Sequence, residues 1–217
     1  MSLDAEEVAK YLKANLNFFE QHAEILTEIH IPDPHGGRAI SLSERQQLAM
    51  RDKNRILENK LLELIQFGEE NDALSQKVHR LSLGLLGVRD LDSALNATIF
   101  NLREDFDVPH VALRLWNCVA NSDRAEFSEA GEAVRAFAEG MAHPQCGHQV
   151  AEGVAEWFGE SAGQLKSFAC VPLRSNQVFG LLVMASEDSQ RFYPEMGTLY
   201  LNRIGELVSA ALLNHLG

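Results

Sequence analysis

The sequence SFACVPLRSNQVFGLLVMAS, residues 167–186, carries the clearest strand signal in the chain. Two apolar runs, residues 168–174 and 178–185, flank the polar residues Ser175-Asn176-Gln177. A short polar break between two apolar runs predicts a β-hairpin. Pro172 has no N–H to donate to a neighbouring strand, so we expect it at a sheet edge or at a bulge.

Further segments complete one domain around this hairpin. Residues 110–116 (HVALRLW) alternate between the two faces of an extended chain and predict another strand. Apolar positions at helical spacing predict helices over residues 91–102, 126–141 and 194–212. Pro194 suits the first position of the last helix, where its missing N–H costs nothing. This order of strands and helices predicts an α+β or α/β domain around one sheet, over residues 88–217.

A long helix is predicted for residues 41–87. It begins at the capping box Ser41-x-x-Glu44, and no proline interrupts it. Apolar residues then recur in alternating steps of four and three, the heptad pattern of a coiled coil, with polar breaks at Asn54 and Asn71. After Asn71 one step is shortened, and such a stammer predicts local overwinding of the coiled coil.

A helix of this length cannot bury its apolar stripe inside a small domain, because about 45 residues span roughly 65 Å. We therefore expect the helix to pair with a second copy of the chain in a homodimer. The predicted dimer interface consists of Leu57, Leu61, Leu64, Leu74, Val78, Leu81 and Leu85. The alternative is that the helix folds back on its own N-terminal segment. That segment, residues 1–40, is predicted to contain two short amphipathic helices and a turn rich in proline and glycine.

Charge and cysteine content exclude several classes of protein. The chain has 19 Lys and Arg against 31 Asp and Glu, a formal net charge of -12, and no strongly basic segment. We therefore expect neither nucleic-acid binding nor attachment to anionic membranes. No apolar run reaches the roughly 20 residues that span a bilayer. The three cysteines form no C-x-x-C pair, which favours a reducing cytoplasm over a disulfide framework.

Two motifs with catalytic or metal-binding spacing are better explained as loops. Residues 159–163 (GESAG) match a nucleophile elbow around Ser161, with Asp188 and His215 following in the order of a hydrolase triad. An elbow needs a strand before it and a helix after it, whereas here a helical stretch precedes and a strand follows. The spacing His143-x-x-Cys146-x-His148 suits a metal, but a turn at Pro144 and Gly147 explains it more simply. We expect neither an enzyme nor a metal site.

The pattern S-x-x-x-V-P-L, G-L-L, S and F in residues 167–192 resembles the end of a GAF domain, a small sensor module. Over its whole length the chain is similar to a proteobacterial family known as a domain of unknown function, DUF484. The residues that carry this match are Tyr11-Leu12, Phe18-Phe19, Ile31-Pro32, His35, Gly36-Gly37, residues 41–46, Cys146-Gly147, residues 186–188, Arg191-Phe192 and residues 196–198. Leu16-Asn17 departs from the pattern, which has proline and aspartate there.

The resemblance implies a GAF-like α+β fold, with a central antiparallel sheet flanked by helices, and a dimer. It identifies no activity and no cofactor. GAF-like pockets lie on one face of the sheet. The candidate residues for binding a small molecule there are Arg114, Trp116, Cys146, His148, Ser167 and Phe168. Solvent exposure is the simpler interpretation of Arg114, which alternates with Leu113 and Leu115. The alternative to a sensor is a scaffold whose GAF-like domain binds a protein and no ligand.

Overall fold

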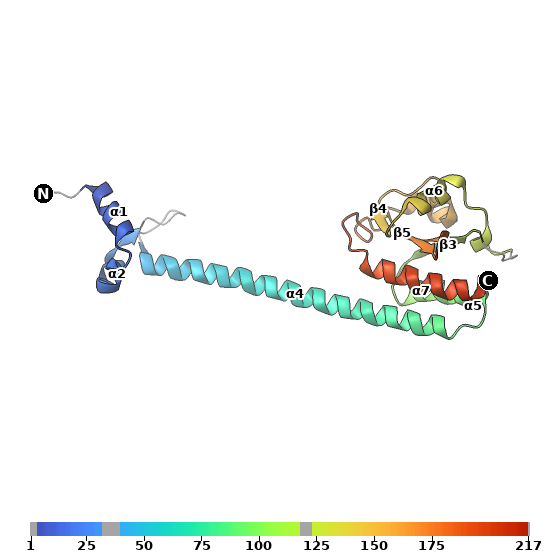
Figure 1. Ribbon diagram of the computed structural model, residues 1–217, viewed down its shortest axis with the longest axis horizontal. Helices are drawn as coiled ribbons and strands as arrows, with labels where there is room; N and C mark the ends of the chain where they lie inside the picture. The colour runs from blue at the N-terminus through green and yellow to red at the C-terminus, as the bar shows by residue number, and fades with distance from the viewer. Residues whose placement is uncertain (1–3, 32–39, 118–122, 217) are drawn as a thin grey trace. The chain divides into compact units, whose positions relative to one another are not determined.

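The computed structural model describes residues 4–31, 40–117 and 123–216 (Figure 1). The chain divides into two compact units, Met1–Glu69 and Glu70–Gly217. We refer to them as the N-terminal unit and the sheet unit. Each is described by itself, and helix α4 contributes residues to both.

The N-terminal unit begins with three short helices, α1 (Ala5–Ala14), α2 (Phe18–Gln21) and α3 (Glu24–Glu28). Asp4 and Glu7 form a capping box at the start of α1. The prediction of two helices was wrong by one, because the backbone leaves the helical conformation at His22 as well as at Asn15. Strands β1 (His30–Ile31) and β2 (Ile40–Ser41) then pair antiparallel. The predicted turn at residues 32–39 lies outside the described residues.

Helix α4 (Leu42–Leu86) is 45 residues long, so the predicted long helix is confirmed. Its acidic first turn, with Glu44, matches the positive end of the helix dipole. The side chain of Ser41, on which the predicted capping box depends, lies outside the described residues.

The sheet unit contains four strands, β3 (His110–Leu115), β4 (Gln145–Gly147), β5 (Ser167–Arg174) and β6 (Val178–Ser186). Their order is β3-β6-β5-β4, and every neighbouring pair is antiparallel. The fold class is therefore α+β, with an antiparallel sheet flanked by helices, and the α/β alternative was wrong.

Pro172 lies where the sequence placed it. Strand β4 ends its pairing with Gln145 opposite Cys170, so β5 is an edge strand beyond that point. The register of β5 and β6 also shifts between Leu173 and Arg174. An edge position tolerates proline because no partner strand needs its N–H.

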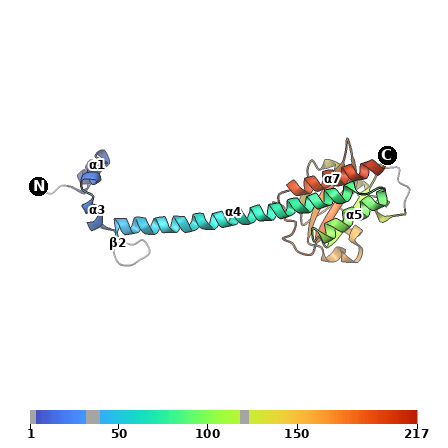
Figure 2. The ribbon, with the colours of Figure 1, turned by 90° about the horizontal axis from the view of Figure 1, so that it is seen from below.

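Two helices cover one face of the sheet, which we call the α7 face. They are α5 (Leu91–Glu104) and α7 (Leu199–Leu216), and Figures 1 and 2 show them side by side next to the end of α4. The core on this face includes Leu113, Val171, Leu182 and Val208. Helix α7 begins at Leu199 and not at Pro194, because residues 193–196 form a turn closed by the Met196 N–H and the Tyr193 carbonyl.

The end of α4 belongs to this same core. Val78, Leu81 and Leu85 are 8%, 0% and 6% exposed, packed with residues of β3, β5 and α7. The assignment of these three residues to a dimer interface was therefore wrong, since their own chain already covers them. Leu74, one turn earlier, is half-buried.

The opposite face of the sheet, which we call the α6 face, carries Trp116, Phe168, Leu181 and Val183 in a second core. It is covered by α6 (Glu132–Gly140) and by the 3₁₀ segment η2 (Ala155–Gln164). Side chains that alternate along each strand thus supply both cores, and the sheet is buried on both faces.

Candidate functional site

The six predicted ligand residues do not come together in one place. Arg114, Trp116 and Phe168 point to the α6 face, since they alternate with residues of the α7-face core. Ser167 lies on the α7-face side of β5, in the same row as Ala169 and Val171. Cys146 packs against the α7-face core. His148 is exposed beyond the end of β4.

Ser167 has a structural role. Its side chain is fully buried, and its hydroxyl donates a hydrogen bond of 2.6 Å to the backbone carbonyl of Asp188. The hydroxyl oxygen of Ser186 accepts from the Asp188 N–H at 3.1 Å. These two bonds hold the turn that follows β6, which removes Ser167 from the candidate site.

The thiols near β4 are poor ligands for a metal. Burial raises the pKa of Cys146 to about 11. Burial, and then the charge of Cys146, raise the pKa of Cys170 to about 12. Both shifts disfavour the thiolate, which is the form that binds a metal. The described residues contain no group of three or more His, Cys, Asp or Glu that could hold a metal ion.

Arg114 is the most distinctive polar residue on the sheet. It is half-buried, and its guanidinium stacks on the ring of Trp157 in η2, 5.0 Å from the ring centroid. One guanidinium nitrogen donates to the Leu113 carbonyl at 2.9 Å. Burial lowers the pKa of Arg114 and the charge of Glu126 opposes this shift; an arginine still remains protonated. The structure therefore places a cation under η2 and not in open solvent.

An ion pair of Arg124 and Glu126 lies beside β3. Glu126 is 8% exposed and accepts two hydrogen bonds from Arg124, at 3.2 and 2.9 Å. Arg124 also binds the side chains of Asp92 and Asn96 on α5, at 3.3 and 2.9 Å. Burial raises the pKa of Glu126, but the hydrogen bond and charge of Arg124 and the charge of Arg114 produce a net lowering. Glu126 is thus an anion that partly balances Arg114.

Aromatic side chains of η2 complete the site. Phe158 meets the ring of His110 edge to face, with centroids 6.3 Å apart, and His110 lies four residues before Arg114 on the same strand. We call Arg114, Glu126, Trp157, His110 and Phe158 the β3 site. The sequence predicted only Arg114 of these. Glu126, Trp157 and Phe158 lie in separate segments that the fold brings to β3, and His110 begins β3 itself.

Trp116 and Phe168 lie in the core on the same face of the sheet as Arg114. The Trp116 indole N–H donates to the Val178 carbonyl at 3.1 Å, and its side chain is 4% exposed. Phe168 is 5% exposed in the same core. Both are core residues that fix the sheet, and their rings are not available as open ligand platforms.

Ser161 of the elbow motif lies within η2, followed by β5. Gly159 interrupts η2 with a φ of 56°, a left-handed conformation that favours glycine. The small residues of this motif therefore shape a 3₁₀ segment over the α6 face.

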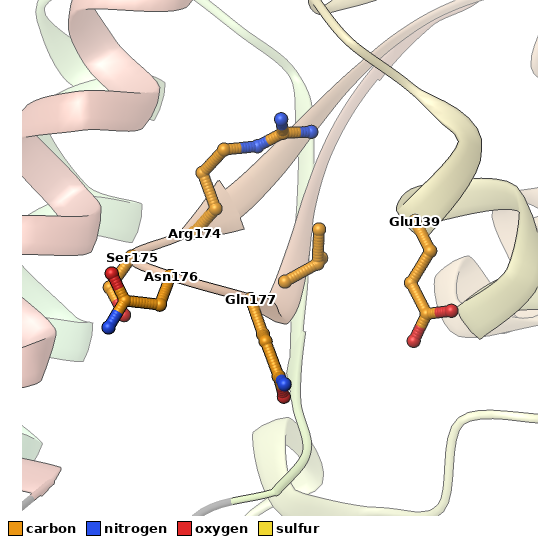
Figure 3. A pocket seen from close by; sticks show the side chains of 6 residues that line it. Glu139, Arg174, Ser175, Asn176 and Gln177 are labelled. Carbon is orange, nitrogen blue, oxygen red and sulfur yellow. The ribbon is translucent and has the colours of Figure 1, made fainter.

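A separate open cavity of about 490 Å³ lies at the β5–β6 turn (Figure 3). Its lining consists of Glu139, Arg174, Ser175, Asn176, Gln177 and Val178. Arg174 is held at both ends, since its guanidinium donates to the Met141 carbonyl and its backbone N–H donates to the Ser209 hydroxyl at 3.1 Å. Arg174 is exposed, whereas Arg114 is half-buried and stacked on Trp157, so the β3 site is the stronger candidate.

The family model "Protein of unknown function, DUF484" matches residues 1–215. The chain belongs to the DUF484 family. This match confirms the family resemblance found in the sequence. No curated protein matches the chain.

Among solved structures, this DUF484 chain is similar to the GAF domain of the potassium sensor histidine kinase KdpD from Escherichia coli. The two share 14% sequence identity, and the alignment covers 64% of this chain and 93% of that chain with a TM-score of 0.43. The fold class stated above rests on the strand order of the DUF484 chain itself.

The N-terminal unit of the DUF484 chain exposes large apolar side chains along α4. Leu57, Leu61 and Leu64 are 54%, 57% and 66% exposed, and Met50 is 69% exposed. The described residues of α1, α2 and α3 leave this stripe uncovered, so the alternative in which α4 folds back on them is not seen. None of the helices that the structure describes combines the length and the apolar character needed to cross a membrane.

Proposed function

We propose that this DUF484 protein is a non-enzymatic, GAF-like regulatory module of the cytoplasm that acts as a homodimer paired through α4. The observation that carries the proposal is the exposed stripe of Leu57, Leu61 and Leu64. Apolar side chains repeated at heptad spacing on one helix face are the contact surface of a coiled coil. Large exposed apolar patches on soluble proteins mark interaction sites.

The energetics support pairing. Full burial of a leucine side chain contributes about 1.5–3 kcal/mol relative to exposure. The three leucines are already close to half covered by their own helix, so each gains on the order of 1 kcal/mol on pairing. Six leucines from two chains, with Met50 and Ile65 beside them, supply a contribution of the same order as the cost of association.

Light scattering tests the dimer. We expect a particle of twice the 24.1 kDa chain mass at micromolar concentration. A particle with the mass of one chain would contradict the proposal.

We further propose that the sheet unit binds a small anionic molecule, such as a carboxylate, at the β3 site. The support is the half-buried guanidinium of Arg114 over Trp157, since a partly desolvated cation attracts an anion more strongly than one in water. An arginine also binds carboxylates through two parallel hydrogen bonds. In this proposal Trp157 and Phe158 form the roof that a ligand displaces.

Thermal unfolding in a panel of small carboxylates and phosphorylated metabolites tests the ligand. We expect at least one compound to raise the Tm by mass action. At a concentration of 100 times its Kd, such a compound adds about 2.7 kcal/mol to the free energy of unfolding. Arg114→Met is expected to lose this shift, whereas Arg103→Met, which removes an exposed arginine from α5, keeps it. An equal shift in Arg114→Met and wild type would exclude the β3 site.

A protein scaffold is the second candidate. The observation that favours it is that Trp157 and Phe158 already pack over Arg114 and His110. If no compound in the panel shifts the Tm while the protein remains a dimer, the scaffold is the better proposal.

A further inference from the structure

We infer that the three short helices of the N-terminal unit form a docking groove for a basic amphipathic helix of another protein. The groove has a volume of about 1030 Å³ and is lined by residues of α1, α2 and α3. Its apolar lining includes Tyr11, Phe18, Phe19, Ile25 and Ile29. This surface is separate from the β3 site and from the leucine stripe of α4.

The apolar side chains around the groove are left uncovered by their own unit. None of the residues between 4 and 31 whose side chains the structure describes is buried. Val8, Tyr11 and Ile29 are 41%, 55% and 37% exposed. Helix α4 contributes no residue to the lining of the groove. Apolar faces that meet without enclosing a core mark an interaction surface, and a unit this small buries little surface by itself.

Aromatic rings give the groove its shape before a partner binds. The ring of Phe18 meets the rings of Tyr11 and Phe19 edge to face, with centroids 6.1 and 5.4 Å apart. On its other side it lies 4.7 Å from the ring of His22. Edge-to-face contacts favour fixed ring orientations. A wall that is already ordered lowers the entropic cost of binding.

The open form of the groove favours a helix over a small molecule. A small-molecule pocket encloses most of the surface of its ligand, whereas the lining of this groove is widely exposed. An amphipathic helix needs cover on one face only. It binds through apolar side chains at positions i, i+3, i+4 and i+7 and keeps its polar face in water.

The charge around the groove identifies the chemistry of that helix. Residues 4–31 contain six acidic residues and two lysines. Carboxylates lie at or next to lining residues in all three helices, at Glu7, Glu20 and Glu28. A helix whose apolar stripe is flanked by Lys or Arg complements this charge. The N-terminal unit of a second copy has the same negative charge, which disfavours it as the occupant.

Three designed peptides test the partner chemistry against the full chain. Two of them carry leucines at i, i+3, i+4 and i+7, with lysine at the other positions in one and glutamate in the other. The third has the composition of the lysine peptide in an order without helical periodicity. Fluorescence anisotropy measures each Kd. We expect the lysine amphipathic peptide to bind about tenfold more tightly than either of the others, because only it matches both the apolar groove and its charge.

Two variants test the position of the site. Val8→Ser with Ile29→Ser removes two exposed lining side chains, and we expect it to raise the Kd of the lysine amphipathic peptide about tenfold. Leu16→Ser is the matched control, because Leu16 is 80% exposed in the same unit and does not line this groove. It is expected to leave the Kd unchanged. Circular dichroism verifies that both variants keep the helical content of the wild type.

Each of the other outcomes would overturn the inference. Absence of binding by the lysine amphipathic peptide would exclude a basic helix as the occupant. Equal binding of the glutamate peptide would contradict the role of charge, and equal binding of the third peptide would contradict recognition of a helix. An unchanged Kd in the double variant would exclude the groove. If light scattering shows that the double variant is a monomer and the wild type a dimer, the second copy occupies the groove and the inference is wrong.

Discussion

Replacement of Leu57 and Leu61 with glutamate is expected to convert the protein into a monomer of 24.1 kDa. The double variant would place four carboxylates in the contact surface of the proposed dimer, where each leaves water without a partner. An uncompensated buried charge costs about 3–5 kcal/mol, so we expect the dimer Kd to rise at least a thousandfold. Light scattering across a concentration series measures the change directly.

The same variant should keep its fold. Leu57 and Leu61 are more than half exposed in the single chain, so their replacement disturbs no core. Asn59→Glu is the matched control, because Asn59 is exposed on the side of α4 away from the leucine stripe. It adds charge to the same helical turns and is expected to leave the dimer intact. A dimeric Leu57→Glu, Leu61→Glu variant would exclude this stripe as the interface.

Gly180→Ala is expected to destabilise the sheet unit by about 3 kcal/mol, in the range of overpacked cores. A Cβ at Gly180 would lie 2.7 Å from Leu115 Cδ2 and 2.8 Å from the Arg114 carbonyl oxygen. That oxygen belongs to the backbone of β3, which β6 holds in register. The clash therefore cannot be relieved by a side-chain rotation. The Tm should fall by roughly 6–12 °C.

Gly147→Ala provides the comparison for Gly180→Ala. Gly147 is also a strand glycine, in β4, but a Cβ there would meet nothing within 4 Å. We expect its Tm to stay within about 2 °C of wild type. Thermal unfolding followed by circular dichroism measures both. Equal melting temperatures for the two variants would show that β3 and β6 are not packed as described.

Local patterns predicted the elements that depend on local chemistry. The hairpin of β5 and β6 follows from two apolar runs around Ser175-Asn176-Gln177, and Pro172 identified the edge of the sheet. The predicted helix boundaries that were wrong are those set by tertiary packing. The start of α7 is one example, because the chain turns at Tyr193 before Leu199 meets the core.

The candidate site was less predictable than the fold. Arg114 was found because a cation interrupts an apolar strand, whereas Trp157 and Glu126 reach it from distant segments. Ser167 and Phe168 are neighbours in sequence, yet alternation along β5 sends them to opposite faces. One is tied to Asp188 and the other lies in the α6-face core. Sequence proximity therefore grouped residues that the sheet separates.

The heptad pattern of α4 shows the division between sequence and structure most clearly. The sequence alone determined that this segment is one long helix with an apolar stripe, because periodicity records which side chains avoid water. It did not determine what covers them. The tertiary structure assigns Val78, Leu81 and Leu85 to the core of their own chain and leaves Leu57, Leu61 and Leu64 exposed. The shortened step after Asn71 thus lies where the stripe passes from exposed side chains to side chains in the core of their own chain, which spacing cannot distinguish from overwinding.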